Sequence, residues 1–411
     1  MKIYYKTFGC RVNQIETESL SEKFASAGAT REEELFNCDM VFINSCSVTE
    51  KADRDVLSLI KKAASLNKKI AITGCYSSLF PEEVLKIAPS AVIISNSEKH
   101  LAPAILFKAA SNDDFFSVKG SHGRTRAFVK VQDGCLLKCS YCIVPYGRSK
   151  LSSKPYEKAL AEISGLVNSG FREITLSGTR LGCYKCPEKG YGLKELLSGV
   201  LAISGNFRIR LSSLEPMEID ESLLSLCSKA GGKFCDHFHL PIQHCCDSVL
   251  KDMRRPYNFA FVKERISMIR SFFPQAGIFA DIISSFPSET DEDFEIMKNR
   301  LSELRLSGLH AFTYSPRPFT PAASMSQLPE KIKRERSKAA RALDSFLRSS
   351  FALSMRGKKL RVLTIGKKDG ATLSLSSNFL NVLLPQALAR NEFYEAEIRG
   401  VSLSFLTGEI L

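Results

Sequence analysis

The chain of 411 residues lacks any run of about 18 apolar residues, the length that a membrane-spanning helix requires. Its first residues, Met1 to Tyr5, do not begin the apolar stretch of a secretory signal peptide. The chain also has no internal repeat and no long low-complexity tract. We therefore expect a soluble, cytoplasmic protein with no membrane partner. Its length and its 44% of hydrophobic residues predict two or three domains.

Cysteine, in contrast, is abundant, with thirteen residues in the chain. A reducing cytoplasm keeps thiols free, so this number indicates metal or cluster ligation rather than disulfides. Cys135, Cys139 and Cys142 follow an extended run in the spacing C-x3-C-x2-C. Three thiolates on one loop can hold three corners of a four-iron four-sulfur cluster and leave the fourth iron open for a substrate or cofactor. A structural zinc site would need a fourth cysteine or histidine nearby, and a disulfide framework would need even numbers, so neither fits this loop.

The first 110 residues alternate apolar strands with helical patterns, which predicts a doubly wound α/β sheet of parallel strands. The expected strands are Lys2–Phe8, Met40–Asn44, Lys69–Thr73 and Ala91–Ile94, and the expected helices are Glu16–Ala27, Ala52–Leu66, Pro81–Ile87 and His100–Ala110. Cys10, Cys46 and Cys75 each follow the carboxyl end of one of the first three strands. Those ends face one crevice, so we expect the three cysteines to converge on one site. Cys38 and Cys227 are expected to fill the core.

After a polar linker at 111–126 the alternation resumes, with six strands separated by helical patterns. The expected strands are Ala127–Gln132, Glu173–Ser177, Phe207–Ser212, His237–Leu240, Gly277–Ile283 and Leu309–Thr313, and the expected helices are Glu157–Asn168, Leu193–Ile203, Glu218–Ser228, Phe259–Ser271 and Asp291–Leu304. Six βα units predict a partial (βα)6 barrel with its chemistry at the carboxyl ends of the strands.

A basic helix, Glu330 to about Phe351, precedes a small all-β module of OB-like size. The stretch from Lys331 to Arg361 carries eleven Lys or Arg residues against Glu335 and Asp344, a charge of +9. This concentration suits a phosphate backbone, although a solvated helix face is the alternative. The expected strands of the module are Lys359–Ile365, Ala371–Leu375, Asn381–Leu384, Tyr394–Val401 and Ser404–Gly408.

Several separated segments together resemble the methylthiotransferases of the radical S-adenosylmethionine class. They are Phe8-Gly-Cys10-Arg-Val-Asn-Gln14 with Glu16-Thr-Glu18, Asn44-Ser-Cys46-Ser-Val-Thr49 with Lys51-Ala-Asp53, Thr73-Gly-Cys75-Tyr76, the C-x3-C-x2-C loop, Leu211-Ser-Ser-Leu-Glu-Pro216 and Tyr314-Ser-Pro-Arg-Pro318. The resemblance implies an N-terminal methylthiotransferase domain (1–110), a radical S-adenosylmethionine barrel with the basic helix (127–353) and a TRAM domain (354–411). It is strongest to the branch that modifies threonylcarbamoyladenosine beside the anticodon of tRNA.

In that family an inert C2–H bond of adenine is broken by a radical, for which the cofactor supplies the chemistry. The resemblance implies two 4Fe-4S clusters, one on Cys135, Cys139 and Cys142 and an auxiliary one on Cys10, Cys46 and Cys75. By their positions at strand ends, the expected contacts of S-adenosylmethionine are Ser177, Gly178, Ser213, Glu215, Gln243, Tyr314 and Ser315. The expected partners are the tRNA anticodon stem-loop, an electron donor such as flavodoxin or ferredoxin, and a sulfur source.

Two loops depart from the family pattern. His244-Cys245-Cys246 follows Pro241-Ile-Gln243, and Ser284, Ser285 and Ser288 stand where glycines are common. We expect serine to replace glycine only where φ is negative. The pair Cys183 and Cys186 is also unusual and is interpreted as loose surface thiols, with half a zinc site as the alternative. Arg208 and Arg210 point to one face of a strand, where they pair a carboxylate or remain solvated.

Three other functions compete with this one. Two belong to the same family: modification of isopentenyladenosine in tRNA, or of an aspartate in a ribosomal protein. The third is a non-catalytic RNA-binding protein with clusters as structural staples. The basic stretch favours RNA over a protein acceptor, and the missing fourth ligand on the three-cysteine loop argues against a purely structural cluster.

Overall fold

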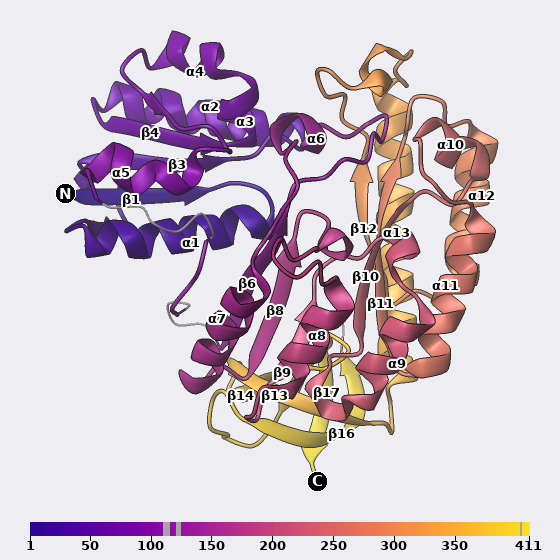
Figure 1. The fold of residues 1–411 in the computed structure, drawn as a ribbon. Helices are drawn as coiled ribbons and strands as arrows, with labels where there is room; N and C mark the ends of the chain where they lie inside the picture. The colour runs from indigo at the N-terminus through magenta and orange to yellow at the C-terminus, as the bar shows by residue number, and fades with distance from the viewer. Residues whose placement is uncertain (110–115, 121–124, 403–404) are drawn as a thin grey trace.

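The structure is a computed structural model that describes residues 1–109, 116–120, 125–402 and 405–411. Three bodies follow one another along the chain: an N-terminal sheet in indigo and purple, a central partial barrel, and a small yellow barrel at the C-terminus (Figure 1). Among the described residues, no helix is both long enough and apolar enough to cross a membrane.

The N-terminal body is a five-stranded parallel sheet in the order β2-β1-β3-β4-β5, with helices on both faces. Its strands are β1 (Lys2–Thr7), β2 (Thr30–Glu32), β3 (Met40–Ser45), β4 (Lys69–Gly74) and β5 (Val92–Ile93), and its helices are α1 (Arg11–Ser26), α2 (Glu50–Ser65), α3 (Cys75–Leu79), α4 (Pro81–Ile87) and α5 (Ala102–Phe107). Separate hydrophobic cores lie on the two faces, one around Val41 and Ile60, the other around Phe24 and Phe42. The predicted doubly wound sheet is therefore confirmed, with the short edge strand β2 as an addition.

The predicted linker lies partly outside the described residues, including Asp113, Asp114 and 121–123. Its described part is packed against both neighbouring bodies. Phe116 is buried in the core of the N-terminal sheet, and the Val118 amide donates a hydrogen bond of 2.9 Å to Glu162 Oε1 in the barrel.

The central body consists of two sheets, β7-β6-β8-β9 and β10-β11-β12, joined by backbone hydrogen bonds between their edges. The strands are β6 (Arg126–Asp133), β7 (Ser152–Ser153), β8 (Glu173–Gly178), β9 (Arg208–Leu211), β10 (His237–Gln243), β11 (Gly277–Ser284) and β12 (Gly308–Thr313). The helices are α6 (Val144–Gly147), α7 (Tyr156–Asn168), α8 (Leu193–Ala202), α9 (Glu221–Lys229), α10 (Asp247–Asp252), α11 (Phe259–Phe272) and α12 (Asp291–Glu303). Except for the short β7, the strands are parallel, and the helices cover one face, as predicted for a partial barrel.

Residues of the barrel strands alternate between the helix-covered core and the opposite, concave face. On β6, for example, Val129 and Val131 are buried in the core, whereas Lys130 and Gln132 point the other way. This period of two places polar side chains of several strands on the concave face. The carboxyl ends of the strands then provide the residues of the candidate site.

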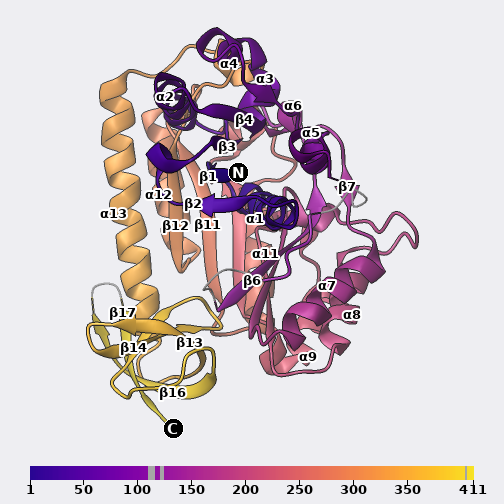
Figure 2. The same ribbon diagram turned by 90° about the vertical axis from the view of Figure 1, so that its left-hand side faces the viewer.

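The basic helix α13 (Glu330–Ser354) runs along the barrel to the C-terminal body, as Figure 2 shows. That body is a closed five-stranded barrel of β13 (Lys359–Lys368), β14 (Ala371–Ser376), β15 (Asn381–Leu384), β16 (Phe393–Ser402) and β17 (Phe405–Ile410). Arg208 and Arg210 anchor it to β9 by donating hydrogen bonds to the carbonyls of Leu375 and Ser377, at 2.9 and 3.0 Å. Both arginines also pair with the buried Glu173, so the first of their two predicted roles is confirmed.

Candidate active site

Cys10, Cys46 and Cys75 lie at the carboxyl ends of the adjacent strands β1, β3 and β4. Their neighbourhood is crowded: a Cβ atom placed on Gly9 would overlap the sulfur of Cys46, and one on Gly74 would overlap the backbone of Ser45. Both glycines have positive φ, 85° and 105°, so the turns after these strands depend on glycine. The structure thus brings together the three cysteines predicted to converge.

Cys135, Cys139 and Cys142 occupy the loop after β6. The loop is fixed by its own backbone, because the Cys135 amide donates to the Arg148 carbonyl at 3.2 Å and the Cys142 amide donates to the Cys139 carbonyl at 3.2 Å. Arg255 Nη1 lies 3.3 Å from the Cys139 sulfur, and the same guanidinium forms an ion pair with Glu215. Arg255 therefore fixes a positive charge next to this loop, between Cys139 and Glu215.

In this structure the sulfurs of each triad are more widely spaced than in a tetrahedral zinc site. In a tetrahedral zinc site with bonds of about 2.3 Å, the sulfurs lie about 3.8 Å apart. Among the described residues, neither set of cysteines has its three sulfurs within 4.8 Å of one another. Burial raises the pKa of Cys46 and of Cys142 to about 12, so a bound cationic group is needed to keep these thiols ionised. In each triad, the chemistry of three thiol donors matches the ligand type of iron–sulfur clusters.

The predicted cofactor contacts gather at the carboxyl ends of β8 to β12. Three hydroxyls at these ends, on Ser177, Ser212 and Ser285, are buried and have no hydrogen-bond partner among the described residues. Unpaired buried hydroxyls are costly, so this edge of the barrel fits a polar ligand such as S-adenosylmethionine. Ser212 and Ser285 are additions to the predicted set.

The remaining predicted contacts differ in burial and in whether their side chains already form hydrogen bonds within the protein. Gly178 ends β8 and Gln243 ends β10, where Gln243 has a φ of 68°. Ser213 Oγ lies 3.1 Å from His239 Nδ1, and Tyr314 is buried directly after β12. The hydroxyl of Ser315, in contrast, accepts a hydrogen bond of 3.1 Å from the Glu50 amide of the N-terminal body.

The two loops that depart from the family pattern contact each other. His244 Nε2 lies 3.0 Å from Glu289 Oε2, and the Ser285 amide donates to both oxygens of that carboxylate at 3.0 Å. Arg336 of α13 pairs with the same carboxylate at 2.6 Å. Ser285 has a φ of 63°, so the expectation that serine stands there only with negative φ is wrong. The bonds to Glu289 hold the turn in this unfavourable conformation.

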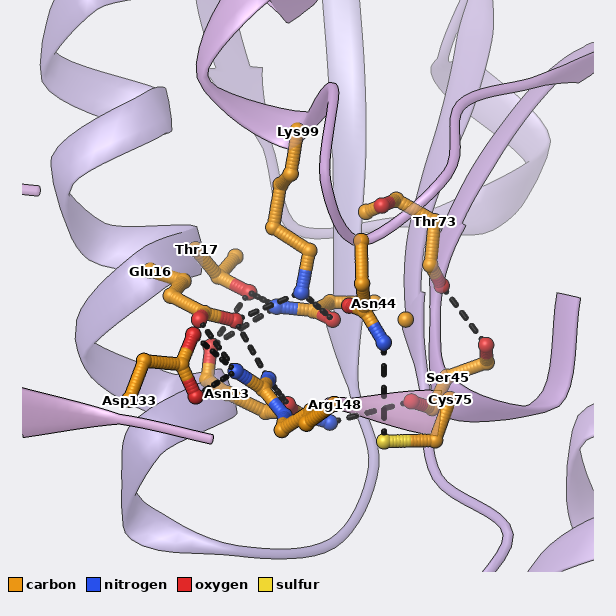
Figure 3. A network of polar contacts seen from close by, with 12 residues as sticks. Asn13, Glu16, Thr17, Asn44, Ser45, Thr73, Cys75, Lys99, Asp133 and Arg148 are labelled. Atoms are coloured by element: carbon orange, nitrogen blue, oxygen red, sulfur yellow. Dashed lines mark hydrogen bonds and ion pairs between the residues drawn. The ribbon is translucent and has the colours of Figure 1, made fainter. Parts of the chain in front are cut away.

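A buried acid, Glu16 of α1, connects the two cysteine sites. It forms ion pairs with Lys99 at 2.5 Å and with Arg148 at 2.9 Å (Figure 3). A third ion pair joins it to Lys130 at 2.6 Å. Burial alone would raise the pKa of Glu16, but the charges of Arg148, Lys130 and Lys99 outweigh it and hold the pKa well below its ordinary value. Asp133 at the end of β6 pairs with both Lys130 and Arg148.

This network touches the backbone next to both triads. The Arg148 guanidinium also donates a hydrogen bond to Asn13 Oδ1 at 2.7 Å. The backbone carbonyl of Arg148 accepts a hydrogen bond from the Cys135 amide. Asn13 in turn donates to the carbonyl of Ser45, the residue before Cys46, at 3.0 Å. Hydrogen bonds and ion pairs thus connect α1 and β6 to the segment that follows the C-x3-C-x2-C loop. Glu16 belongs to a segment that carries the family resemblance, but its spacing gives no sign of these ion pairs, so sequence reasoning missed this role.

A second contact joins the bodies beside the first triad. Arg317, from the Tyr-Ser-Pro-Arg-Pro motif, forms a buried ion pair with Asp53 of the Lys-Ala-Asp motif. Phe319 stacks on Phe80, with ring centroids 5.9 Å apart. A cavity of about 660 Å³ lies at the interface, lined from the N-terminal body by Asn96 and from the barrel by residues that include Gly147 and Arg148. The Lys-Ala-Asp and Tyr-Ser-Pro-Arg-Pro motifs, which are far apart in the sequence, therefore contact each other in the fold.

Four cysteines outside the two triads differ in their burial. Cys38 and Cys227 are buried, as predicted. Cys186 is also buried, with 1% of its surface exposed, and the Tyr156 amide donates to its sulfur at 3.4 Å. The interpretation of Cys186 as a loose surface thiol is therefore wrong. Cys183 is half-buried, 3.9 Å from Glu218 Oε1.

A partial barrel with a three-cysteine loop after its first strand, and unpaired hydroxyls at its strand ends, defines a radical S-adenosylmethionine enzyme. The model of the radical SAM superfamily matches residues 129–301, and that of a family described as uncharacterized protein family UPF0004 matches residues 2–95. Among solved structures, the radical S-adenosylmethionine methyltransferase TsrM from Kitasatospora setae shares the fold with a TM-score of 0.58 at 13% identity, covering 78% of this chain and 77% of that one.

Curated relatives define the family more narrowly. The threonylcarbamoyladenosine tRNA methylthiotransferase MtaB of Aquifex aeolicus is 34% identical over 93% of this chain and 96% of its own. MtaB of Bacillus subtilis is 31% identical over 88% and 84%. The tRNA-2-methylthio-N(6)-dimethylallyladenosine synthase of Paracidovorax citrulli is 31% identical over 90% and 88%. The chain belongs to the methylthiotransferase family of radical S-adenosylmethionine enzymes, and it is a transferase that uses a 4Fe-4S cluster and S-adenosylmethionine.

Proposed function

We propose that this chain adds a methylthio group to C2 of N6-threonylcarbamoyladenosine next to the anticodon of tRNA. The observation that carries the proposal is the pair of cysteine triads, each at the strand ends of its own domain and tied together through Glu16. The relatives with 34% and 31% identity that are named MtaB support this nucleoside as the substrate.

In this proposal, Cys135, Cys139 and Cys142 hold the cluster that binds S-adenosylmethionine, and Cys10, Cys46 and Cys75 hold the auxiliary cluster. When bound, these groups supply the radical that breaks the C2–H bond and the methylthio sulfur that replaces the hydrogen. The residues of the chain hold and orient them. Arg255 places a positive charge beside Cys139, where it offsets the negative charge of thiolate ligands.

The strand-end residues would form the cofactor pocket. Ser177 and Gly178 lie at the end of β8, Ser213 and Glu215 follow β9, and Gln243 ends β10. Tyr314 and Ser315 close the opposite side after β12. Glu215 acts there through Arg255, with which it forms an ion pair, and burial raises the pKa of Glu215. The interdomain contacts of Ser315 and Arg317 keep the N-terminal body over this edge.

The basic helix and the C-terminal barrel would bind the anticodon stem. Five cationic side chains of α13 are exposed: Lys331, Arg334, Lys338, Arg341 and Arg348, of which Arg348 pairs with Asp344 of the same helix. Arg336, in contrast, is buried in ion pairs with Glu289 and Asp291, so its predicted role in phosphate binding is replaced by a structural one. Turnover also requires a low-potential electron donor, such as flavodoxin or ferredoxin, and a source of sulfur.

The nucleoside composition of tRNA tests this function in cells. We expect a strain without the gene to lose methylthio-threonylcarbamoyladenosine and to accumulate its parent nucleoside. Complementation with the intact gene should restore the modification, and complementation with a Cys135→Ala gene should not. Loss of the methylthio form of dimethylallyladenosine instead would establish the second candidate, which the 31% identical synthase represents.

A further inference from the structure

Three titratable side chains lie side by side on the concave face of the barrel. They are His239 on β10, Asp281 on β11 and His310 on β12. Asp281 Oδ1 lies 2.8 Å from His239 Nε2 and 3.2 Å from His310 Nδ1. The two imidazole rings are perpendicular, with centroids 4.9 Å apart. No residue of this layer is a cluster ligand.

The layer faces away from the helices. The residues next to it along the strands, including Leu240, Ala280 and Leu309, are buried in the hydrophobic core. Because side chains alternate along a strand, the three polar groups project to the opposite face. There His310 keeps 48% of its side chain exposed, against 18% for His239 and 21% for Asp281.

The hydrogen bonds leave one ring nitrogen of this layer without a partner among the described residues. Burial would raise the pKa of Asp281, but the hydrogen bonds from His239 and His310 outweigh it and hold the pKa at about 2. An ionised carboxylate only accepts, so both imidazoles donate to it. His239 then meets the Ser213 hydroxyl through Nδ1, at 3.1 Å. His310 is left with Nε2 directed away from Asp281, on the exposed side of the chain of bonds.

The layer lies below the strand ends that form the cofactor pocket. Along β11 and β12, Asp281 precedes Ser285 and His310 precedes Tyr314 by four residues each, which span about 13 Å in an extended chain. Gln243 lies nearer to the layer, because a register shift in β10 pairs it with Ile282. In adenine, C2 and C6 flank N1 and their outward bonds diverge, so an adenine that turns C2 toward the cofactor directs its C6–N6 bond toward another part of the pocket. A threonylcarbamoyl arm extends about 5 Å beyond N6, by the bond lengths of a peptide unit.

Building on the proposed function, we propose that His310, positioned by Asp281 and His239, binds the polar end of the N6 substituent and so selects threonylcarbamoyladenosine over adenosines with a hydrocarbon substituent. Nε2 accepts a hydrogen bond when the ring is neutral and donates one when the ring carries a second proton. It can pair with the hydroxyl or the carboxylate of a threonyl group. A dimethylallyl group offers no partner and would desolvate the polar layer without compensation.

The test uses two anticodon stem-loop RNAs that differ only at N6 of the target adenosine, one with threonylcarbamoyl and one with dimethylallyl. The matched variants are His310→Leu, which removes the polar end, and His310→Gln, which keeps one. For the threonylcarbamoyl RNA we expect His310→Leu to lower kcat/KM about 10- to 100-fold, mainly through KM, as the loss of one hydrogen bond to a charged group would. His310→Gln should recover part of this loss. The dimethylallyl RNA should not lose activity, and formation of 5′-deoxyadenosine without RNA should be unchanged.

Unchanged selectivity in His310→Leu would overturn this proposal while leaving the proposed function intact. Failure of the unaltered enzyme to modify the threonylcarbamoyl RNA would instead contradict the proposed function, and with it this proposal. Titration of the reconstituted enzyme with Mn²⁺, followed by electron paramagnetic resonance, checks the competing use of two histidines and one carboxylate as a metal site. Stoichiometric Mn²⁺ binding that is lost in His310→Leu would also overturn the proposal, and no such binding is expected.

Discussion

Replacing Glu16 by glutamine should strongly destabilise the junction between the N-terminal body and the barrel. The substitution keeps the volume of the side chain but removes the buried charge that faces Lys99, Lys130 and Arg148. Removing one partner of a buried ion pair costs about 3–5 kcal/mol, because the remaining charge is left uncompensated. Lys130 and Arg148 retain Asp133, and Lys99 retains the amide oxygen of Asn44 as its one remaining partner among the described residues, so we expect the lower end, about 3 kcal/mol.

Urea unfolding of the cluster-free protein measures this effect. The chain has no tryptophan, so the far-ultraviolet circular dichroism signal replaces intrinsic indole fluorescence. With a slope of about 1–3 kcal/mol per molar urea, the first transition of Glu16→Gln should shift down by about 1–3 M. The exposed Glu50→Gln is the matched control and should change stability by less than about 1 kcal/mol. Adding Lys99→Met to Glu16→Gln should recover part of the loss, because it removes the stranded cation. A Glu16→Gln protein as stable as the Glu50→Gln control would refute the argument.

Three further predictions concern charge and cluster content. The stability advantage of the unaltered protein over Glu16→Gln should be full above about pH 4.3 and should shrink below it, because the pKa of Glu16 is lowered in the folded state; a pH-independent difference in urea midpoints would contradict this. Changing Cys10, Cys46 and Cys75 together to alanine should reduce iron from about eight to about four per chain while cleavage of S-adenosylmethionine persists, and undiminished iron would exclude the auxiliary site. Neutralising Lys331, Arg334, Lys338 and Arg341 should flatten the log–log salt dependence of tRNA binding by about two to three units, and an unchanged slope would exclude docking by this helix.

Much of the site follows from local patterns that can be recognised in the sequence. Parallel strands bring their carboxyl ends to one edge, so three cysteines placed directly after β1, β3 and β4 had to converge. The alternation of residues in β6 to β12 likewise predicts which side chains leave the hydrophobic core. Glu330 was also correctly predicted as the start of the basic helix α13.

Long-range pairing is what the sequence does not disclose. Glu16 meets Lys99, Lys130 and Arg148 only after three segments have folded together, and no spacing along the chain indicates this. In the sequence, Arg336 is one of many cations of the basic helix. In the structure, the strained turn at Ser285 is held by hydrogen bonds to Glu289, and the carboxylate of Glu289 forms an ion pair with Arg336. Tertiary context therefore decides which charges of the basic helix remain available for RNA.

The most direct test of the central claim is mass spectrometry of the nucleosides formed by the reconstituted enzyme. The protein is incubated anaerobically with dithionite, S-adenosylmethionine and tRNA that carries N6-threonylcarbamoyladenosine, with Cys135→Ala as the control. We predict the 2-methylthio form of that nucleoside together with 5′-deoxyadenosine from the unaltered enzyme, and neither product from Cys135→Ala, although that variant binds tRNA with nearly the same affinity. Formation of 5′-deoxyadenosine without any methylthio nucleoside, or equal products from Cys135→Ala, would contradict the account.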